Sequence, residues 1–183
     1  MVWIWGCCKK PKLHPFSENY KLDGAVISAV DLIKGIGIYA GLEIIKVPGA
    51  TGYLDTNYEN KASYALRALE KKDFVYLHVE SIDEAAHAGD VKAKIKAIED
   101  FDRRLIARNL DGLQNFDRYK ILLLTDQYTP IAERTHTNEP VPFAILSSDA
   151  KNEKDSVEKF DEEAARKGIF GLVNGIELMK IFL

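Results

Sequence analysis

The sequence predicts an α/β fold with a mostly parallel sheet that helices cover on both faces. Short apolar runs alternate along the chain with longer segments whose apolar residues recur every three or four positions. Such alternation is typical of strand–helix–strand units, which build parallel sheets. The runs at 74–79, 121–125 and 142–147 are also apolar for most of their length, as expected for strands that are buried on both faces.

Helices are expected before and between these runs. A helix over 28–40 would begin at Ser28, and a helix over 57–71 would be capped by Asp55 or Thr56, because serine, threonine and aspartate are good capping residues. The other expected elements are a short strand at 43–47, a long helix from 91 to about Leu110, and closing helices at 160–167 and 173–182. The long helix would bury one apolar stripe, formed by Val91, Ile95, Ile98, Phe101, Leu105 and Ile106.

The length of 183 residues suits one domain. Residues 1–24 carry Pro11 and Pro15 and show no periodic pattern, so they are expected to form an irregular lead-in to a domain over 25–183. Apolar residues make up 46% of the chain and charged residues 29%. This composition is typical of a globular protein and excludes disorder as the main state.

Composition also excludes several classes of partner and of protein. The formal net charge of −3 gives no overall attraction to nucleic acid. No segment approaches the roughly 20 apolar residues of a membrane span, so no membrane contact is expected and the protein is predicted to be cytoplasmic. The only cysteines, Cys7 and Cys8, are adjacent, which excludes a secreted disulfide scaffold.

Acidic and histidine side chains follow the predicted strands. Asp83 and His87 come after the run at 74–79 and are four residues apart, so a helix would project both from one face. Asp126 follows 121–125 directly, and His136 precedes 142–147. Ligands of open α/β sheets bind at the carboxyl ends of the strands, and carboxylate with imidazole suits Zn²⁺ or Mn²⁺. The sequence therefore predicts a divalent metal site at this edge.

Each of these residues also has a purely structural interpretation. Asp83 and His87 would then be a capping residue and a surface histidine, Asp126 would cap a turn, and His136 would be a solvated loop residue. His78, which lies inside an apolar run, is interpreted as a core histidine bonded to a neighbour.

Several motifs resemble one known family. Residues 83–90 read DEAAHAGD and resemble the DEAGHxGD motif of the archaeal-type, cofactor-independent phosphoglycerate mutases, which belong to the alkaline phosphatase superfamily. The stretches 24–37, 47–52 with 55–58, and 134–137 with 140–143 are similar to that family as well. The resemblance runs from about Trp3 to the C-terminus.

The resemblance implies an alkaline-phosphatase-like fold and the interconversion of 3-phosphoglycerate and 2-phosphoglycerate in glycolysis. In the family, two divalent metals activate a serine that takes and returns the phosphoryl group. By resemblance, Asp83, His87 and His136 would hold one metal, and Asp126 would help to hold the second. The expected metal is manganese or zinc, and otherwise magnesium or cobalt. Lys34 would bind the substrate phosphate or carboxylate, or else be a solvated helix residue.

The chain departs from the family pattern in three ways. Ala86 stands where the family motif has glycine, which would tighten the turn between Asp83 and His87. The family motif Asp-His-x-Thr-Pro reads DQYTP from Asp126, so Gln127 replaces a metal-binding histidine with a weaker ligand, and at most one metal site is expected. The family's N-terminal strands, its substrate-binding domain and its nucleophilic serine have no counterpart here. We therefore expect the C-terminal part of a mutase, inactive as an isolated chain.

Two other functions remain open from the sequence. One is a non-catalytic remnant with a single residual metal site, and the other is a different metal-dependent phosphatase or phosphotransferase of the superfamily. Expected partners are phosphoglycerate, if an N-terminal half complements the chain, and a second copy of the chain through an exposed sheet edge.

Overall fold

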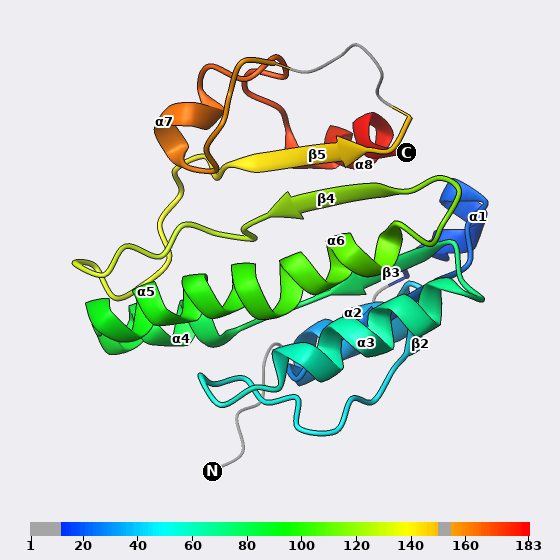
Figure 1. The fold of residues 1–183 in the computed structure, drawn as a ribbon, viewed down its shortest axis with the longest axis horizontal. Helices are drawn as coiled ribbons and strands as arrows, with labels where there is room; N and C mark the ends of the chain where they lie inside the picture. Colours follow the sequence, from blue (N-terminus) through cyan, green and yellow to red (C-terminus); the bar gives the residue numbers. More distant parts are fainter. Residues whose placement is uncertain (1–11, 150–154) are drawn as a thin grey trace. The chain divides into compact units, whose positions relative to one another are not determined.

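The computed structural model describes residues 12–149 and 155–183 (Figure 1). They cluster into two compact units, one made of the chain up to Ala85 with Lys92–Gly112 and the other of Ala86–Val91 with Leu113–Leu183. Cys7 and Cys8 lie outside the described residues, as does the first part of the predicted lead-in. None of the helices in the described ranges is long and apolar enough to cross a bilayer.

Helices and strands alternate along the chain in this order. The elements up to the fourth helix are α1 (Phe16–Tyr20), β1 (Gly24–Ile27), α2 (Asp31–Tyr39), β2 (Glu43–Ile44), α3 (Tyr58–Leu69), β3 (Phe74–Leu77) and α4 (Ser81–Ala88). The remaining elements are α5 (Val91–Asp100), the π-helix η1 (Phe101–Ile106), α6 (Ala107–Leu113), β4 (Lys120–Leu124), β5 (Phe143–Ser147), α7 (Glu162–Ala165) and α8 (Gly175–Phe182).

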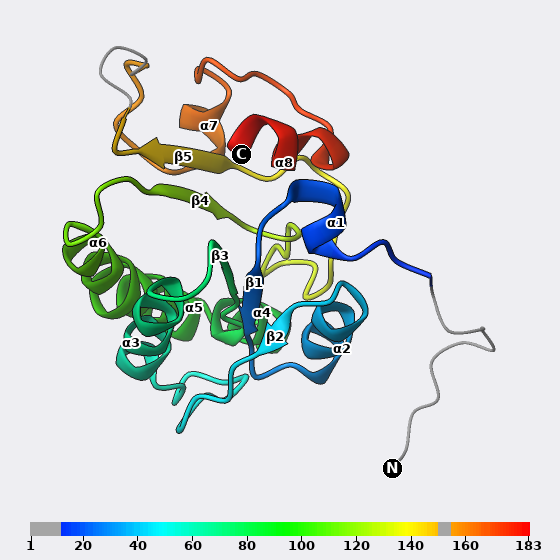
Figure 2. The same cartoon turned by 90° about the vertical axis from the view of Figure 1, so that its right-hand side faces the viewer.

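A parallel three-stranded sheet organises the first unit, in the order β2-β1-β3. The central strand β1 is buried along its whole length, as expected for a strand covered on both faces. Figure 2 shows α2 on one side of this sheet and α3 on the other. On the α2 side, a Cβ atom added at Gly37 would lie 2.8 Å from the Val26 side chain, so the helix packs directly on β1. The predicted α/β fold with a parallel sheet is thus confirmed.

Two helix starts differ from the prediction. The helix predicted from Ser28 begins at Asp31, after Val30 in extended conformation. The Ser28 side chain accepts a hydrogen bond from the Val30 N–H instead of capping the helix. Helix α3 is capped by Asn57, whose side chain accepts from the Asn60 N–H, so the caps predicted at Asp55 and Thr56 are wrong.

The core of the first unit lies between α3, β3 and η1. Tyr58, Ala62 and Leu105 are buried there, and Leu77, Val79, Phe101 and Ile106 pack against them. The predicted apolar stripe of the long helix is split, because Phe101, Leu105 and Ile106 join this core while Ile95 and Ile98 remain 53% and 48% exposed. Strand β3 is only partly buried, and Tyr76 is 36% exposed, so the prediction that this strand is buried on both faces is wrong.

The second unit contains the antiparallel pair β4 and β5, in which Lys120 lies opposite Ser147 and Leu124 opposite Phe143. Both strands form where the apolar runs predicted them, but the prediction that they are buried on both faces is wrong, because Leu124 is 40% and Leu146 44% exposed. The second strand also runs back along the first. The connection between them holds no helix, and a parallel return would require a crossover of a dozen or more residues, which is usually a helix. The sheet pairings of the described chain are therefore mostly parallel, with this one antiparallel pair.

Candidate metal centre

Helix α4 carries two of the predicted metal ligands. The Glu80 carbonyl accepts hydrogen bonds from the Asp83 and Glu84 N–H groups, which starts the first turn. Gly89 ends the helix in the left-handed region at φ +71°, where glycine is favoured. Asp83 and His87 are therefore one turn apart on one helix, as their spacing predicts.

A loop of the second unit supplies His136. The Thr137 N–H donates to the Tyr128 carbonyl at 2.8 Å, closing the two ends of the loop. Within it, Arg134 adopts φ +52°. The Arg134 carbonyl accepts a hydrogen bond from the His87 ring at 2.9 Å, so the loop is fixed to the end of α4.

That bond places a proton on one nitrogen of the His87 ring. A carbonyl can only accept, so Nδ1 is the donor, and Nε2 is the nitrogen that the neutral ring would offer to a metal. The same arrangement, with the second ring nitrogen bonded to a backbone carbonyl, is usual for histidines that bind metals. His87 is thus prepared to use Nε2 as a ligand atom.

The His136 ring lies beside this nitrogen. Its Nε2 is 3.0 Å from His87 Nε2 and accepts from the Gln127 amide at 2.9 Å. A bound cation would take both ring nitrogens as ligands in their unprotonated form. Two imidazoles on one tetrahedral zinc ion would hold their nitrogens about 3.4 Å apart, from Zn–N bonds of about 2.1 Å, so the observed spacing fits a shared ion with small adjustment.

Asp83 completes a group of three. The ligand atoms of Asp83, His87 and His136 all lie within 4.8 Å of one another. Because one continuous helix holds Asp83 and His87, the group consists of that helix and one loop. A carboxylate with two imidazoles is a donor set that suits Zn²⁺ or Mn²⁺.

The structure places the other predicted site residues as follows. Asp126 is exposed after β4 and does not belong to this group of three. Gln127, at the position where the family pattern has histidine, is bonded to His136. Lys34 pairs with Asp31 on α2 at 2.6 Å, and its ammonium holds the pKa of the Asp31 carboxyl below its usual value.

A second polar cluster, next to the metal ligands in sequence, was not predicted. His78 Nδ1 and the Ser28 hydroxyl share a hydrogen bond at 3.2 Å, and His78 Nε2 lies 3.2 Å from the Glu80 carboxylate, so the interpretation of His78 as a histidine bonded to a neighbour is confirmed. Lys61 is fully buried and donates to the His78 carbonyl at 3.1 Å. The sequence feature that could have indicated a buried Lys61 is its position beside the apolar face of the helix predicted over 57–71.

Comparison with known proteins gives one matching family. Residues 6–183 match the family model described as the metalloenzyme superfamily. A Methanosarcina barkeri protein named 2,3-bisphosphoglycerate-independent phosphoglycerate mutase is 52% identical over 183 residues, which are 100% of this chain and 46% of the relative. A Methanothermobacter thermautotrophicus protein of the same name, numbered 2, is 51% identical over all of this chain and 45% of its own length. The chain thus spans about half the length of these relatives.

Solved structures share the fold. A Pyrococcus horikoshii protein superposes with a TM-score of 0.86 at 33% identity, over 92% of this chain and 50% of that one. The cofactor-independent phosphoglycerate mutase of Thermoplasma acidophilum superposes with a TM-score of 0.70 at 23% identity, over 94% of this chain and 39% of that one. The second likeness shows the α/β fold alone.

Proposed function

Since this chain belongs to the metalloenzyme superfamily, we propose that it carries one divalent-metal site of a phosphoglycerate mutase. Asp83, His87 and His136 hold the ion in this proposal. The observation that carries it is the hydrogen bond from His87 Nδ1 to the Arg134 carbonyl, which leaves Nε2 as a ligand atom beside His136 Nε2. The names of the relatives at about half identity support the reaction, the interconversion of 3-phosphoglycerate and 2-phosphoglycerate.

The residues of this chain would contribute to phosphoryl transfer by binding and orientation. A bound divalent ion stabilises negative charge on phosphoryl oxygens. Asp83, His87 and His136 fix its position, and Lys34 binds the substrate phosphate or carboxylate after leaving Asp31. Asp126 takes part in a second site, which Gln127 weakens because an amide oxygen is a poorer ligand than imidazole.

We propose that turnover needs a segment beyond the matched region, which supplies the serine nucleophile. The relatives extend well past the part that this chain matches. A mixture of the chain with the remaining part of the Methanosarcina barkeri relative should convert 3-phosphoglycerate, whereas the chain alone should not. Measurable conversion by the chain alone would contradict this division of roles.

A second candidate function is a non-catalytic remnant with one metal site. Gln127 favours it, because its amide is bonded to His136 Nε2 and would compete with a metal for that lone pair. Failure of the complemented mixture to convert 3-phosphoglycerate, together with retained metal binding, would favour this remnant.

Metal binding is tested by equilibrium dialysis of the full chain against Mn²⁺, followed by metal analysis. One ion per chain is expected for the wild type, and none for His136→Ala. His14→Ala is the matched control, because His14 is an exposed histidine remote from this group in sequence, and it should retain the ion. No bound ion in the wild type would refute the site, and two tightly bound ions would refute the weakened second site.

We also propose that the isolated chain associates with itself through a sheet edge. Strands β2 and β3 are the outer strands of the sheet in the first unit, and an unpaired edge favours pairing with another chain. Sedimentation velocity over a concentration series should show a growing dimer fraction. A monomer at all concentrations would contradict this proposal.

A further inference from the structure

We propose that Tyr58 and Lys61 of helix α3 are positioning residues for the metal centre, because they hold the segment that starts helix α4. This segment, residues 78–81, joins β3 to the helix that carries Asp83 and His87. The inference rests on the proposed function of those two residues as metal ligands.

Tyr58 holds the first residue of α4. Its hydroxyl is 2.6 Å from the Ser81 hydroxyl, and both residues are 0% exposed. Burial raises the pKa of the Tyr58 phenol, so the group stays neutral and can donate. Ser81 is only two residues before Asp83 in the first turn of α4, so a shift of Ser81 would move that carboxylate.

Lys61 holds the end of the preceding strand. It lies one turn after Tyr58 on the same buried side of α3, is 0% exposed, and donates to the His78 carbonyl at 3.1 Å. Burial lowers its pKa to about 8, against the opposing effect of Glu80. A buried lysine is unfavourable compared with an apolar side chain of similar length. The hydrogen bond from its ammonium to the His78 carbonyl offsets part of this cost.

The side chains of the segment are held from other elements too. The His78 ring is bonded to Ser28, which follows the central strand β1, at 3.2 Å. The opposite ring nitrogen lies 3.2 Å from the Glu80 carboxylate. Other elements thus hold the segment through the His78 carbonyl, the His78 ring and the Ser81 hydroxyl, while the Glu80 carboxylate holds the ring from within the segment. Several bonds to one short segment favour one backbone position over others.

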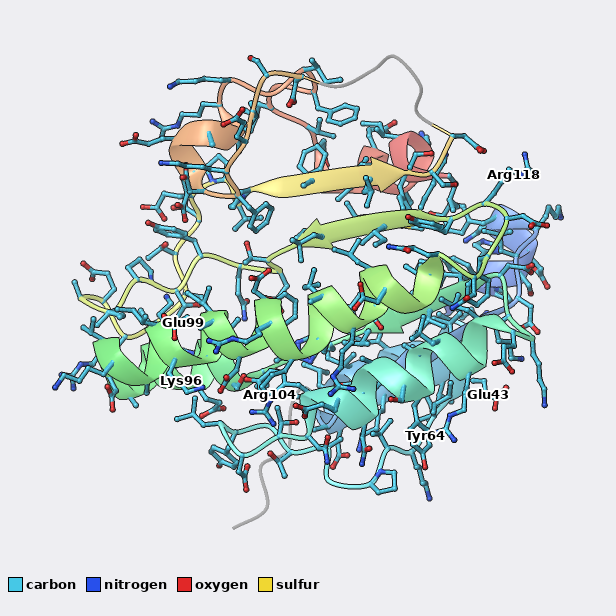
Figure 3. The ribbon with its side chains drawn as sticks, viewed as in Figure 1. Glu43, Tyr64, Lys96, Glu99, Arg104 and Arg118 are labelled. Atoms are coloured by element: carbon cyan, nitrogen blue, oxygen red, sulfur yellow. The ribbon has the colours of Figure 1, made fainter. Side chains whose placement is uncertain are left out.

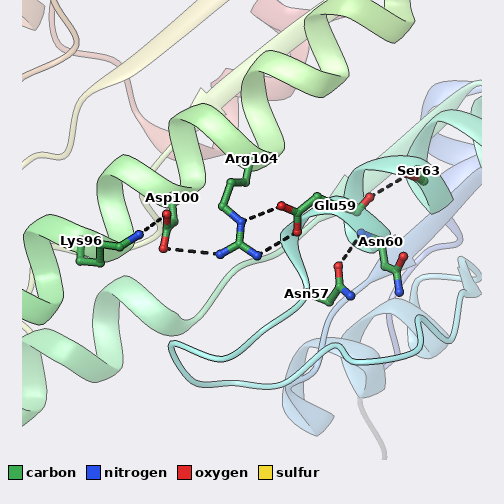
Figure 4. A network of polar contacts seen from close by, with 7 residues as sticks. All are labelled: Asn57, Glu59, Asn60, Ser63, Lys96, Asp100 and Arg104. Atoms are coloured by element: carbon green, nitrogen blue, oxygen red, sulfur yellow. Dashed lines mark hydrogen bonds and ion pairs between the residues drawn. The ribbon is translucent and has the colours of Figure 1, made fainter.

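Helix α3 is itself fixed at the end that carries Tyr58. Arg104 of η1 donates to both carboxylate oxygens of Glu59, at 2.7 and 2.9 Å, and its guanidinium lies 5.1 Å from the centre of the Tyr58 ring. Figure 3 shows Arg104 pointing from its helix toward α3, and Figure 4 shows the continuation of this network to Asp100 and Lys96. The first turn of α3 is therefore a firm support for residues 78–81.

The test uses the full chain with Tyr58→Phe and Lys61→Met, which remove the polar atoms and keep the approximate shape. Mn²⁺ affinity is measured by electron paramagnetic resonance, and exchange of the Asp83 and Glu84 amides by NMR or mass spectrometry. Both variants should bind Mn²⁺ about tenfold more weakly, the lower end of the effect of removing an outer-shell partner of a metal ligand. Both should also exchange these two amides faster, since they donate to the Glu80 carbonyl.

The controls are on the same helix or directly after it. Tyr64→Phe removes the hydroxyl of a ring that packs against the Arg67 guanidinium, and Lys71→Met removes an exposed ammonium. Both should leave the Mn²⁺ affinity and the amide exchange unchanged. Ser81→Ala removes the Ser81 hydroxyl, the partner of the Tyr58 hydroxyl, and changes fewer atoms of the site. The double variant with Tyr58→Phe should lose no more Mn²⁺ affinity than either single variant.

Variants that bind Mn²⁺ as tightly as the wild type would overturn the inference, even if they unfold more easily, because a merely structural role affects stability alone. If the wild type binds no Mn²⁺, the proposed metal site fails and the positioning role fails with it. If the wild type binds Mn²⁺ and the variants bind it equally well, only the positioning role fails.

Discussion

The buried Lys61 should make the stability of this protein rise with pH in the alkaline range. Its pKa is lowered from 10.5 to about 8 in the folded protein. Between these values the unfolded chain still binds the lysine proton while the folded chain releases it. The unfolded state then binds more protons, so the free energy of unfolding increases as the pH rises.

The size of this effect follows from the two pKa values. Below about pH 8 the ammonium is present in both states, and its burial is unfavourable. From about pH 7 to about pH 10 the free energy of unfolding should increase by at most about 2.5 kcal/mol through this one group. The measurement stops there because burial raises the pKa of Tyr58 above 10.0. That phenol contributes with the opposite sign at higher pH.

Urea unfolding at a series of pH values checks this prediction. The difference in unfolding free energy between wild type and Lys61→Met should change across the series, with the wild type gaining on the variant as pH rises. Lys71→Met should follow the wild type, because Lys71 is exposed. Parallel profiles for wild type and Lys61→Met would show that Lys61 keeps an ordinary pKa, and the argument from its burial would be wrong.

Three further predictions concern the loop, the helix contact and the metal. Gly89→Ala should lower the free energy of unfolding by about 1–2 kcal/mol, because φ is +71° there. Urea unfolding measures this change, and an unchanged free energy of unfolding would contradict it; the new Cβ would lie 2.5 Å from Arg134 Nε, but the flexible end of that side chain can move aside. Arg104→Met should lower the free energy of unfolding by about 1 kcal/mol, a small effect because the Arg104–Glu59 ion pair is partly exposed. Most of this loss should be absent when the same substitution is made in Glu59→Gln, which already lacks the ion pair. Mn²⁺ at about 100 times its dissociation constant should stabilise the chain by about 2.7 kcal/mol in thermal unfolding, and it should leave His136→Ala unchanged.

Local spacing predicted part of the candidate site. Asp83 and His87 share a helix face because four residues make about one turn, and this holds whatever surrounds the helix. His136 could be placed near them only through the order of strands and loops. The bond between His87 and the Arg134 carbonyl could not be predicted, because it depends on the left-handed Arg134 and on the closure of a loop.

The misplaced features have physical reasons as well. Ser28 is a good cap by residue type, but its hydroxyl is already used by Val30 and His78. Strand β1 was not predicted, since three apolar residues before a helix have no period that could be recognised. The direction of β5 could not be predicted, because a continuous apolar run looks the same in parallel and antiparallel pairs, although the strand itself is only partly buried.

The π-helix η1 has a consequence for insertions and deletions. A π-turn holds one more residue than an α-turn spread over the same length, so it shifts the phase of the helix by about 100°, one residue of 3.6 per turn. Ile95 and Ile98 before it are thereby turned away from the core that Leu105 enters after it. Deleting one residue within Phe101–Ile106 would restore an uninterrupted α-helix and rotate α5 against α3. The rotational phase of the helix, rather than any single side chain, thus decides whether Arg104 can pair with Glu59.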